Sequence, residues 1–462
     1  MQARSNAAGR DAAAAECRRN SDSGHQAPPG ARRGGGRRRG GILSHVFLLI
    51  VAVLLALGWL ALGSTLLAAS RRMRLLREVL DPEGEVLEPG ALPSLSVIVT
   101  ARDEASGIET TVQRLLAQEY PGLEVVVVDD RSTDGTSAIL DRLAAGTAPR
   151  PGRLTVIHNR ALPDGWLGKC HACRLGAERA RGEWLLFTDG DVTLARRDLL
   201  ARSVRLAGRE RLDHVAVTPD TRPMSPLQAG LVSLFGQIFL LAVRAHEMDR
   251  DRPRGGGGVG AFNLVRRTAY ERVGGHHPLR MDAADDIKLG MLLKESGARQ
   301  RIYNGLDLIL CPWQRGTLNV IRGLEKNFFG GCDYSLARIL VITGGLLALT
   351  FGPPALALLD LCGAWEPGSW AWQGAAWLPL AIAVGLLGTG YLLNARRFGV
   401  SPWLFLLHPV SVLLLVAAAW NSTLRILARG GVRWRGTFYP LADLRRGLVR
   451  SGDGRGVRRH EI

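Results

Sequence analysis

Long apolar segments lie toward both ends of the chain and flank a central region with a different pattern. The first runs from residue 42 to residue 69, where His45 is the only ionisable side chain. About 20 such residues span the hydrocarbon core of a bilayer, so residues 41–70 are predicted to form a membrane anchor. Residues 336–421 are predicted to form further membrane segments. They contain three apolar runs, at 338–360, 372–394 and 402–420.

Residues 93–335 alternate short apolar runs with segments of helical spacing. Strands that alternate with helices of this length form parallel sheets through right-handed crossovers. The predicted strands are almost continuously apolar, which indicates a sheet covered on both faces. The predicted fold class is therefore a nucleotide-binding α/β domain with a mostly parallel sheet. The predicted strands are 95–100, 123–130, 153–158 and 184–187, and the predicted helices are 108–118, 133–145 and 169–181.

Two further helices and a glycine-rich loop are predicted after this repeat. Residues 225–243 are apolar but contain two glutamines, which leaves open whether this helix lies in the core, at an interface or against an acceptor. The glycines at 255–258 predict a flexible loop. Asp285 and Asp286 open the second helix, where acidic side chains suit the positive N-terminal end, and Gly297 ends it.

Most of the formal net charge of +17 comes from arginine. The arginines flank the apolar segments and fill both tails, and they do not form a basic face interleaved with exposed aromatics. A nucleic-acid partner is therefore disfavoured, and an anionic membrane surface is favoured. Residues 1–40 are predicted to be a disordered basic tail, and residues 422–462 a basic cytoplasmic tail.

The arginines between residues 71 and 77 favour a cytoplasmic position for the α/β domain, although the basic N-terminal tail partly contradicts this. Three full crossings after that domain would place the basic C-terminal tail on the opposite side. His408-Pro409 interrupts the last apolar run and would break or bend a helix there. We therefore expect one of these segments to be re-entrant or interfacial, in a multi-pass protein of the cell inner membrane.

Six cysteines are scattered along the chain without the spacing of a disulfide framework, so reduced thiols are expected. Cys170 and Cys173 form a C-x-x-C sequence. No second pair of cysteines or histidines has a suitable spacing, which disfavours zinc or redox chemistry at this position.

Acidic residues occur in pairs where predicted strands end or a helix begins. The pairs are Asp129 with Asp130, Asp189 with Asp191, and Asp285 with Asp286. The carboxyl ends of parallel strands share one edge of a sheet, so the first two pairs are expected to be neighbours. Three such pairs would repel one another unless a metal and positive side chains offset them. A lone D-G-D sequence is more often a polar turn, but here a nucleoside diphosphate held through Mg²⁺ or Mn²⁺ explains all three pairs.

Four segments in order resemble the successive motifs of family-2 glycosyltransferases with the GT-A fold. The segments are S-V-I-V-T-A-R-D-E (96–104), V-V-V-D-D-R-S-T-D-G-T (126–136), F-T-D-G-D-V (187–192) and D-D-I-K-L-G (285–290). L-P-D-G-W-L-G-K (162–169) and the terminal W-R-G-T-F-Y resemble the membrane-bound branch that includes hopanoid-associated and carotenoid glycosyltransferases. The resemblance implies inverting transfer of a sugar from a nucleotide-sugar donor, expected first to be a UDP-sugar.

The resemblance also implies roles for the acidic pairs and for the first motif. Asp286, with Asp285 beside it, would serve catalysis as the base, and a helix-capping role is the alternative for Asp286. Asp191, with Asp189 nearby, would serve the metal and the diphosphate. The residues expected to bind the donor are Thr100, Arg102, Glu104, Asp129, Asp130 and Asp189.

Two basic residues leave alternatives open. Lys169 is the best candidate for neutralising a phosphate, and a solvated lysine at a helix start is the alternative. Arg435 belongs to the Arg-Trp-Arg sequence at 433–435, which could anchor at the lipid headgroups or reach the site and contact an acceptor or a diphosphate. His171 is expected to have a structural or solvent role.

The sequence departs from the family pattern at two places. Asp103 stands in the first motif where asparagine is usual, and Q-x-x-R-W is absent, because Gln314-Arg315 is followed by Gly316-Thr317. The second departure disfavours a processive polysaccharide synthase. A lipid acceptor of isoprenoid or glycerolipid type is favoured, because a soluble acceptor would not require flanking membrane segments. A catalytically silent membrane scaffold is the remaining alternative, although such a protein has no reason to keep mutually repulsive carboxylates.

Overall fold

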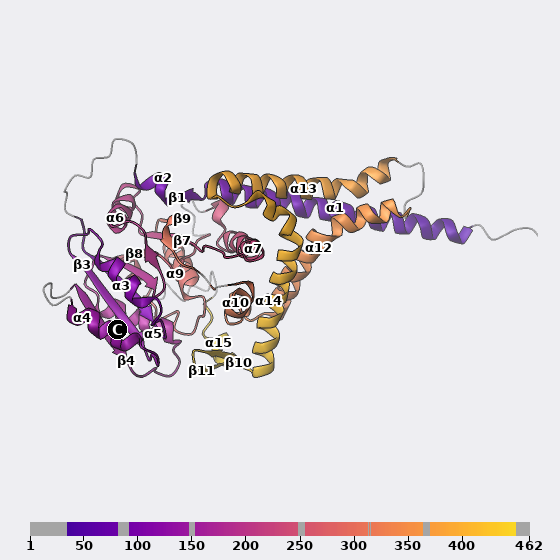
Figure 1. Ribbon diagram of the computed structural model, residues 1–462. Coiled ribbons are helices and arrows are strands. Elements are labelled where there is room, and N and C mark those ends of the chain that lie inside the picture. Colours follow the sequence, from indigo (N-terminus) through magenta and orange to yellow (C-terminus); the bar gives the residue numbers. More distant parts are fainter. Residues whose placement is uncertain are drawn as a thin grey trace, which may run out of the picture. The chain divides into compact units, whose positions relative to one another are not determined.

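The computed structural model describes residues 35–81, 92–146, 153–247, 255–312, 314, 316–363 and 370–449, with the backbone alone for residues 35–45 and 370–373 (Figure 1). The segment expected to be disordered, residues 1–40, lies mostly outside the described residues. The contacts discussed below lie within residues 49–462, which form one compact unit.

A mixed nine-stranded sheet forms the centre of the domain. Its order is β1-β9-β7-β8-β5-β2-β3-β4, with the short β6 beside β9. The strands β2 to β5 run parallel to one another, as the sequence predicts, whereas β8 is antiparallel to both β5 and β7. The strands are β1 (Arg74–Leu75), β2 (Leu95–Ala101), β3 (Leu123–Asp130), β4 (Leu154–Asn159), β5 (Trp184–Asp189), β6 (Thr193–Leu194), β7 (His214–Asp220), β8 (Asn263–Arg266) and β9 (Gln300–Leu310).

Helices cover both faces of this sheet, which explains the continuous apolar strands. In β2, Val97 and Val99 pack into one apolar cluster, while Ile98 packs into another on the opposite face. The first cluster takes in α3 (Ile108–Leu116), α4 (Thr136–Gly146) and α6 (Leu199–Arg209). The second takes in α5 (Gly168–Arg179), α8 (Arg267–Arg272) and α9 (Asp285–Glu295). The expected two-sided burial of the sheet is thus confirmed.

Within the described part of the chain, four helices are long and apolar enough to cross a membrane: residues 46–72 of α1 (Gly35–Arg72), α12 (Leu336–Leu361), residues 374–398 of α13 (Trp370–Phe398), and residues 402–429. α1 packs on α12 and α13, where Gly58 lies against Leu349 and Gly63 against Leu386. The Trp59 indole donates to the Leu349 carbonyl over 2.7 Å. α1 begins at Gly35, so the helix extends into the last residues of the expected disordered tail.

The last apolar segment is broken where the sequence predicts it. A 3-10 helix, η2 (Pro402–Leu407), precedes α14 (His408–Arg429), whose first turn contains Pro409. α14 packs on α7 (Pro226–Ala242), α10 (Thr317–Leu324) and α11 (Phe328–Gly331), and Figure 1 shows it running across the direction of α13. It ends well beyond residue 421, the expected boundary of the membrane region. A hairpin of β10 (Gly431–Trp434) and β11 (Thr437–Pro440) follows, then α15 (Leu441–Arg446).

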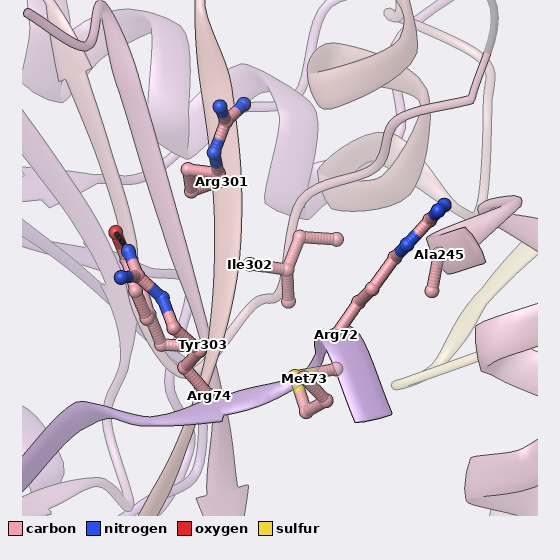
Figure 2. Close-up of a pocket in the computed structure, with 7 residues that line it drawn as sticks. All are labelled: Arg72, Met73, Arg74, Ala245, Arg301, Ile302 and Tyr303. Carbon is pink, nitrogen blue, oxygen red and sulfur yellow. Dashed lines mark hydrogen bonds between the residues drawn. The ribbon is translucent and has the colours of Figure 1, made fainter. Parts of the chain in front are cut away.

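A pocket lies at the junction between the end of α1 and the sheet (Figure 2). The helix α2 (Leu76–Leu80) directly follows β1 there. Arg74 lies beside Tyr303 there, whereas Arg72 points toward Ala245 of the 3-10 helix η1 (Ala245–Glu247). The residues that line the pocket come from α1, β1, β9 and η1 and from the link between α1 and β1. None of these elements carries a candidate residue of the acidic site, so the pocket is separate from it.

Candidate active site

The ends of β2, β3 and β5 bring the first two acidic pairs to one edge of the sheet. β2 lies between the other two strands, with Thr100 beside Asp189 and Ala101 beside Asp129. The pairs therefore flank one strand and do not sit on adjacent strands. This shared edge is the one that the parallel pattern predicts.

Lys169, Asp189 and Asp286 converge around Gly260. Lys169 Nζ lies 2.8 Å from Asp189 Oδ1. A Cβ added to Gly260 would lie 2.9 Å from the Oδ2 atoms of both Asp189 and Asp286, and 3.1 Å from Lys169 Nζ. Lys169 begins α5, as expected, but it is not a solvated lysine, because its side chain is mostly buried and paired. The second and third acidic pairs thus meet through a lysine at a point where a larger residue would have to displace these side chains.

Asp286 faces this point because of the way α9 packs. The Gly260 N–H donates to Asp286 Oδ2 over 2.7 Å, and the N-cap of α9, Ala284, makes no side-chain cap bond. Gly290 of α9 lies so close to the backbone of Gly257 that an added Cβ would come within 2.1 Å of it. The loop at 255–258, predicted to be flexible, is instead packed against α9, because its glycines permit this close approach.

Asp285 has surroundings that differ from those of Asp286. It is buried, and His276 Nε2 lies 3.8 Å from its Oδ2. Burial raises the pKa of Asp285 to about 7, although the positive charge of Lys169 acts in the opposite direction. Burial also lowers the pKa of His276 to about 3. The two carboxylates predicted together therefore have different surroundings, and Asp286 is the one that lies at the edge of the sheet.

Protein donors already hold the Asp129 and Asp130 carboxylates. Asp129 accepts hydrogen bonds from Ser137 and from His158 Nδ1, at 2.5 and 2.9 Å. Asp130 accepts two from Arg131, at 2.9 and 2.8 Å, and lies against Gly168 at the start of α5. Hydrogen bonds lower the pKa of Asp129 despite its burial. Both carboxylates are therefore fixed in position by protein donors, and arginine and histidine lie beside them.

Arg102 is a candidate residue for binding the nucleotide sugar, and one of its N–H groups makes no hydrogen bond. Its Nε is buried and makes no hydrogen bond. Its Nη1 lies 3.8 Å from Asp130 Oδ2, and burial followed by the charge of Arg131 lowers its pKa. Asp103 Oδ2 lies 4.0 Å from this Nε, and buried donors are rarely left without a hydrogen bond, so Arg102 Nε is available to a water molecule or a ligand at the edge of the sheet.

Asp191 lies among other negative groups. Both of its carboxylate oxygens are 4.0 Å from Cys311 Sγ. Loss of hydration raises the pKa of Asp191 to about 6, with further contributions from the charges of Asp189 and Glu104. A carboxylate crowded by two others, with no cation paired to it among the described residues, is a suitable ligand for a hard divalent cation.

The β10–β11 hairpin contacts this same edge. Arg435 Nη2 lies 2.6 Å from Glu104 Oε1, and the Tyr439 hydroxyl accepts a hydrogen bond from Gly168 N over 3.3 Å. Of the two alternatives for the 433–435 sequence, the structure thus places Arg435 at the site. Thr437, which lies in β11 like Tyr439, adds a contact with Arg131 at 3.4 Å.

Residues 96–274 match the family described as glycosyl transferase family 2. These residues are a family-2 glycosyltransferase domain. The chain is 24% identical over 365 residues to a 4,4'-diaponeurosporenoate glycosyltransferase of Staphylococcus aureus (strain bovine RF122 / ET3-1), covering 76% of this chain and 89% of the relative. The enzyme of the same name from strain USA300 is also 24% identical, over 358 residues.

The fold of the glycosyltransferase domain is also found in a solved structure. The mannosyltransferase PcManGT from Pyrobaculum calidifontis, in complex with GDP-Man and Mn²⁺, superimposes with a TM-score of 0.50. It is 23% identical, and the match covers 82% of this chain and 99% of that one. The GT-A fold expected from the sequence motifs is confirmed.

The oxygen atoms at the glycosyltransferase site fit a divalent cation, which Asp189 and Asp191 would bind beside Glu104. A second group, Cys173, His276 and Asp285, brings three possible ligand atoms within 4.8 Å of one another. Burial holds the pKa of the Cys173 thiol well above its usual range, and a protonated thiol is a poor ligand. The interpretation that disfavours metal chemistry at the C-x-x-C sequence stays a prediction.

Several residues of the glycosyltransferase site carry no signal in the sequence. Gly260 follows a glycine-rich loop and gives no sign that it borders Lys169. His158 ends β4 and holds Asp129, and it is recognisable only once β4 is placed beside β3. Lys326 lies between α10 and α11, outside every motif, yet it contacts Trp434 of the hairpin. His171 is buried, as expected for a structural residue, and packs edge-on against Trp166.

Proposed function

We propose that this protein is a membrane-anchored, inverting glycosyltransferase that moves a sugar from a nucleotide-sugar donor to a hydroxyl group of a lipid. The convergence of Lys169, Asp189 and Asp286 around Gly260 carries the proposal. A carboxylate that can accept a proton (Asp286), a cation (Lys169) and a candidate metal ligand (Asp189) lie within a few ångströms of one another. They lie at the sheet edge where GT-A enzymes are expected to bind their donor.

In the proposed reaction, Asp286 takes the proton from the acceptor hydroxyl. The hydroxyl oxygen forms a bond to the anomeric carbon as the bond from that carbon to the phosphate oxygen breaks. The electron pair of the broken bond leaves with the nucleoside diphosphate, and attack from the opposite face inverts the configuration. A carboxylate within hydrogen-bond reach of the hydroxyl can serve as the base.

The leaving diphosphate is negatively charged and requires neutralisation. Mg²⁺ or Mn²⁺ bound by Asp191 and Asp189 would supply a Lewis acid for the developing charge. Lys169 is proposed to contact the phosphates, and Arg435 approaches the same edge through Glu104. Thr100, Arg102, Glu104, Asp129 and Asp130 are proposed to hold the nucleoside and ribose, with Arg102 Nε, which makes no hydrogen bond, as the best-placed donor. A UDP-sugar remains the first donor to test, and a GDP-sugar the second.

A lipid acceptor is supported by the apolar helices beside the domain and by the diaponeurosporenoate named in the relatives. An isoprenoid or glycerolipid acceptor fits both observations. α7 lies between the catalytic domain and α14, so a lipid that reaches the sheet edge from the bilayer would pass near it.

Nucleotide release by purified full-length protein in detergent tests the proposal. UDP- and GDP-sugars are supplied with and without Mn²⁺ or Mg²⁺ and with and without host lipid extract. We expect release to require both metal and lipid, with the product sugar inverted at its anomeric carbon. Metal-dependent release without lipid would contradict the acceptor assignment alone. An absence of both release and donor binding would contradict the enzyme assignment and favour a scaffold.

We also propose a membrane topology in which α1, α12 and α13 cross the inner membrane and α14 lies at its surface. The hairpin after α14 contacts the catalytic domain through Arg435 and Tyr439, so both ends of residues 336–429 lie on one side. An even number of crossings is therefore required. α14 is the segment that we propose does not cross. Its buried residues recur every three or four positions and pack on the catalytic side, whereas apolar residues such as Leu413 and Leu424 are exposed. The proposed domains are 93–335 (catalytic), 336–421 (membrane) and 422–462 (tail).

Reporter fusions test this topology. A reporter placed after Arg446 is expected to be active only in the cytoplasm, and one inserted at Gly363, after α12, only in the periplasm. An insertion at Gly399, between α13 and η2, is the matched cytoplasmic control. Periplasmic activity of the Arg446 fusion would mean that α14 crosses.

A further inference from the structure

Lys326 places a further positive charge at the glycosyltransferase site. It lies on the short connection between α10 and α11, after the catalytic motifs and before the membrane helices. Its Nζ is 3.8 Å from the centre of the Trp434 ring. Within the described part of the chain no carboxylate lies within ion-pair distance of this ammonium group, whereas Lys169 pairs with Asp189 and Arg435 with Glu104.

The electrostatic surroundings connect Lys326 to the site. Burial, followed by the positive charges of Lys169 and Arg435, lowers its pKa to about 8. The carboxylates of Asp189 and Asp285 act in the opposite direction. A partly buried lysine that is close to two other cations and lacks an ionic partner is costly. An anion bound between these cations would remove that cost.

The β10–β11 hairpin holds Trp434 in place over Lys326. Its two-residue turn has positive φ angles at Arg435 (+45°) and Gly436 (+81°), the combination found in type I′ hairpin turns. A positive φ is unfavourable for arginine, and the contact with Glu104 offsets this strain. Tyr439 and Thr437 fix the other strand to Gly168 and Arg131. A ring face attracts an ammonium group, so the hairpin orients Lys326 as well as Arg435.

We propose that Lys326 binds the diphosphate of the donor and stays with the leaving nucleoside diphosphate, while Trp434 acts as its positioning residue. The proposal rests on the proposed function, since it requires a nucleoside diphosphate as the ligand. The donor diphosphate is favoured over a charged acceptor headgroup because Lys326 lies near Lys169 and Asp189, at the proposed metal and phosphate end of the site. Its ammonium group can donate to oxygens of the phosphate released when the sugar leaves.

Binding measurements on the purified full-length protein test this role. Affinities for UDP and GDP, and for UMP and GMP, are measured with Mn²⁺ by calorimetry for the wild type, Lys326→Met and Trp434→Leu. We expect Lys326→Met to weaken binding of the preferred nucleoside diphosphate by about 10- to 100-fold, the range for a charged hydrogen bond, with a smaller loss of monophosphate binding. Trp434→Leu should have a weaker effect of the same kind. Lys326→Arg should recover most of the lost affinity.

The control is Arg322→Met, which removes an exposed positive charge from α10 and should leave both affinities unchanged. Melting temperatures in detergent show whether each variant is folded. Equal losses for diphosphate and monophosphate would overturn the proposal. So would unchanged diphosphate affinity with a raised KM for the lipid, which would assign Lys326 to the acceptor. If wild-type protein binds no nucleoside diphosphate, the proposed function itself fails.

Discussion

Replacing Asp286 by asparagine is expected to reduce kcat for sugar transfer by about 10²- to 10⁴-fold, the usual contribution of a general base. Asparagine keeps an oxygen that can accept the Gly260 N–H bond, which is 2.7 Å long in the structure. The variant can therefore keep the contact with Gly260, but it loses the ability to take up the hydroxyl proton and one acceptor, because Asp286 Oδ1 also accepts from the Ile287 N–H over 2.8 Å. Nucleoside diphosphate binding with Mn²⁺ should change by about twofold or less, since the transferred proton belongs to the acceptor.

Glu109→Gln is a suitable control, because Glu109 is also an acidic residue in the first turn of a helix, α3, and pairs on the surface with Arg142. Its transfer rate should equal that of the wild type. Steady-state release and single-turnover transfer are measured with the same lipid extract. A rate for Asp286→Asn close to the wild-type rate would assign the base to another group.

Replacing Asp191 by asparagine is expected to affect a different step. The carboxylate lies beside Asp189 and Glu104, and its raised pKa reflects this crowding. Removing its charge should weaken Mn²⁺-dependent binding of the nucleoside diphosphate by at least about tenfold. Transfer should fall by about 10²- to 10³-fold, the effect of losing one electrostatic contact to a developing charge.

The distinguishing result is the dependence on metal concentration. Asp191→Asn should require a higher Mn²⁺ concentration for half-maximal activity, whereas Asp286→Asn should not. Asp307→Asn removes an exposed aspartate that pairs with Arg77 and provides the control. An unchanged metal requirement in Asp191→Asn would exclude this residue as a ligand.

The parallel half of the sheet could be predicted because its strands are buried on both faces and therefore read as continuous apolar runs. β7, β8 and β9 could not. β8 has only four residues, and Asn304-Gly305 interrupts the apolar pattern of β9, where the pairing with β7 shifts register. The positions of these strands depend on pairing between segments that are distant in the sequence. The apolar pattern within each strand does not indicate which strand it pairs with.

The acidic site was predictable to the level of pairs, and the structure separates the members of one pair. Successive residues of an α-helix point in directions about 100° apart, so Asp285 and Asp286 have different neighbours, although the charge of Lys169 acts on both. Which of them faces Gly260 depends on the close packing of Gly290 on Gly257. Lys326 and Trp434 were beyond prediction for a related reason, since they are far apart in the sequence and meet only through the path of α14.

The contact between Arg435 and Glu104 joins residues 331 positions apart. The apolar helices α12, α13 and α14 lie between them, so in the proposed topology α12 and α13 enter the membrane before the hairpin can reach its partner. A nascent chain that already contains all the acidic motifs still lacks Trp434 and Arg435. The enzyme is therefore completed only after membrane insertion, which restricts sugar transfer to molecules that already stand beside their lipid.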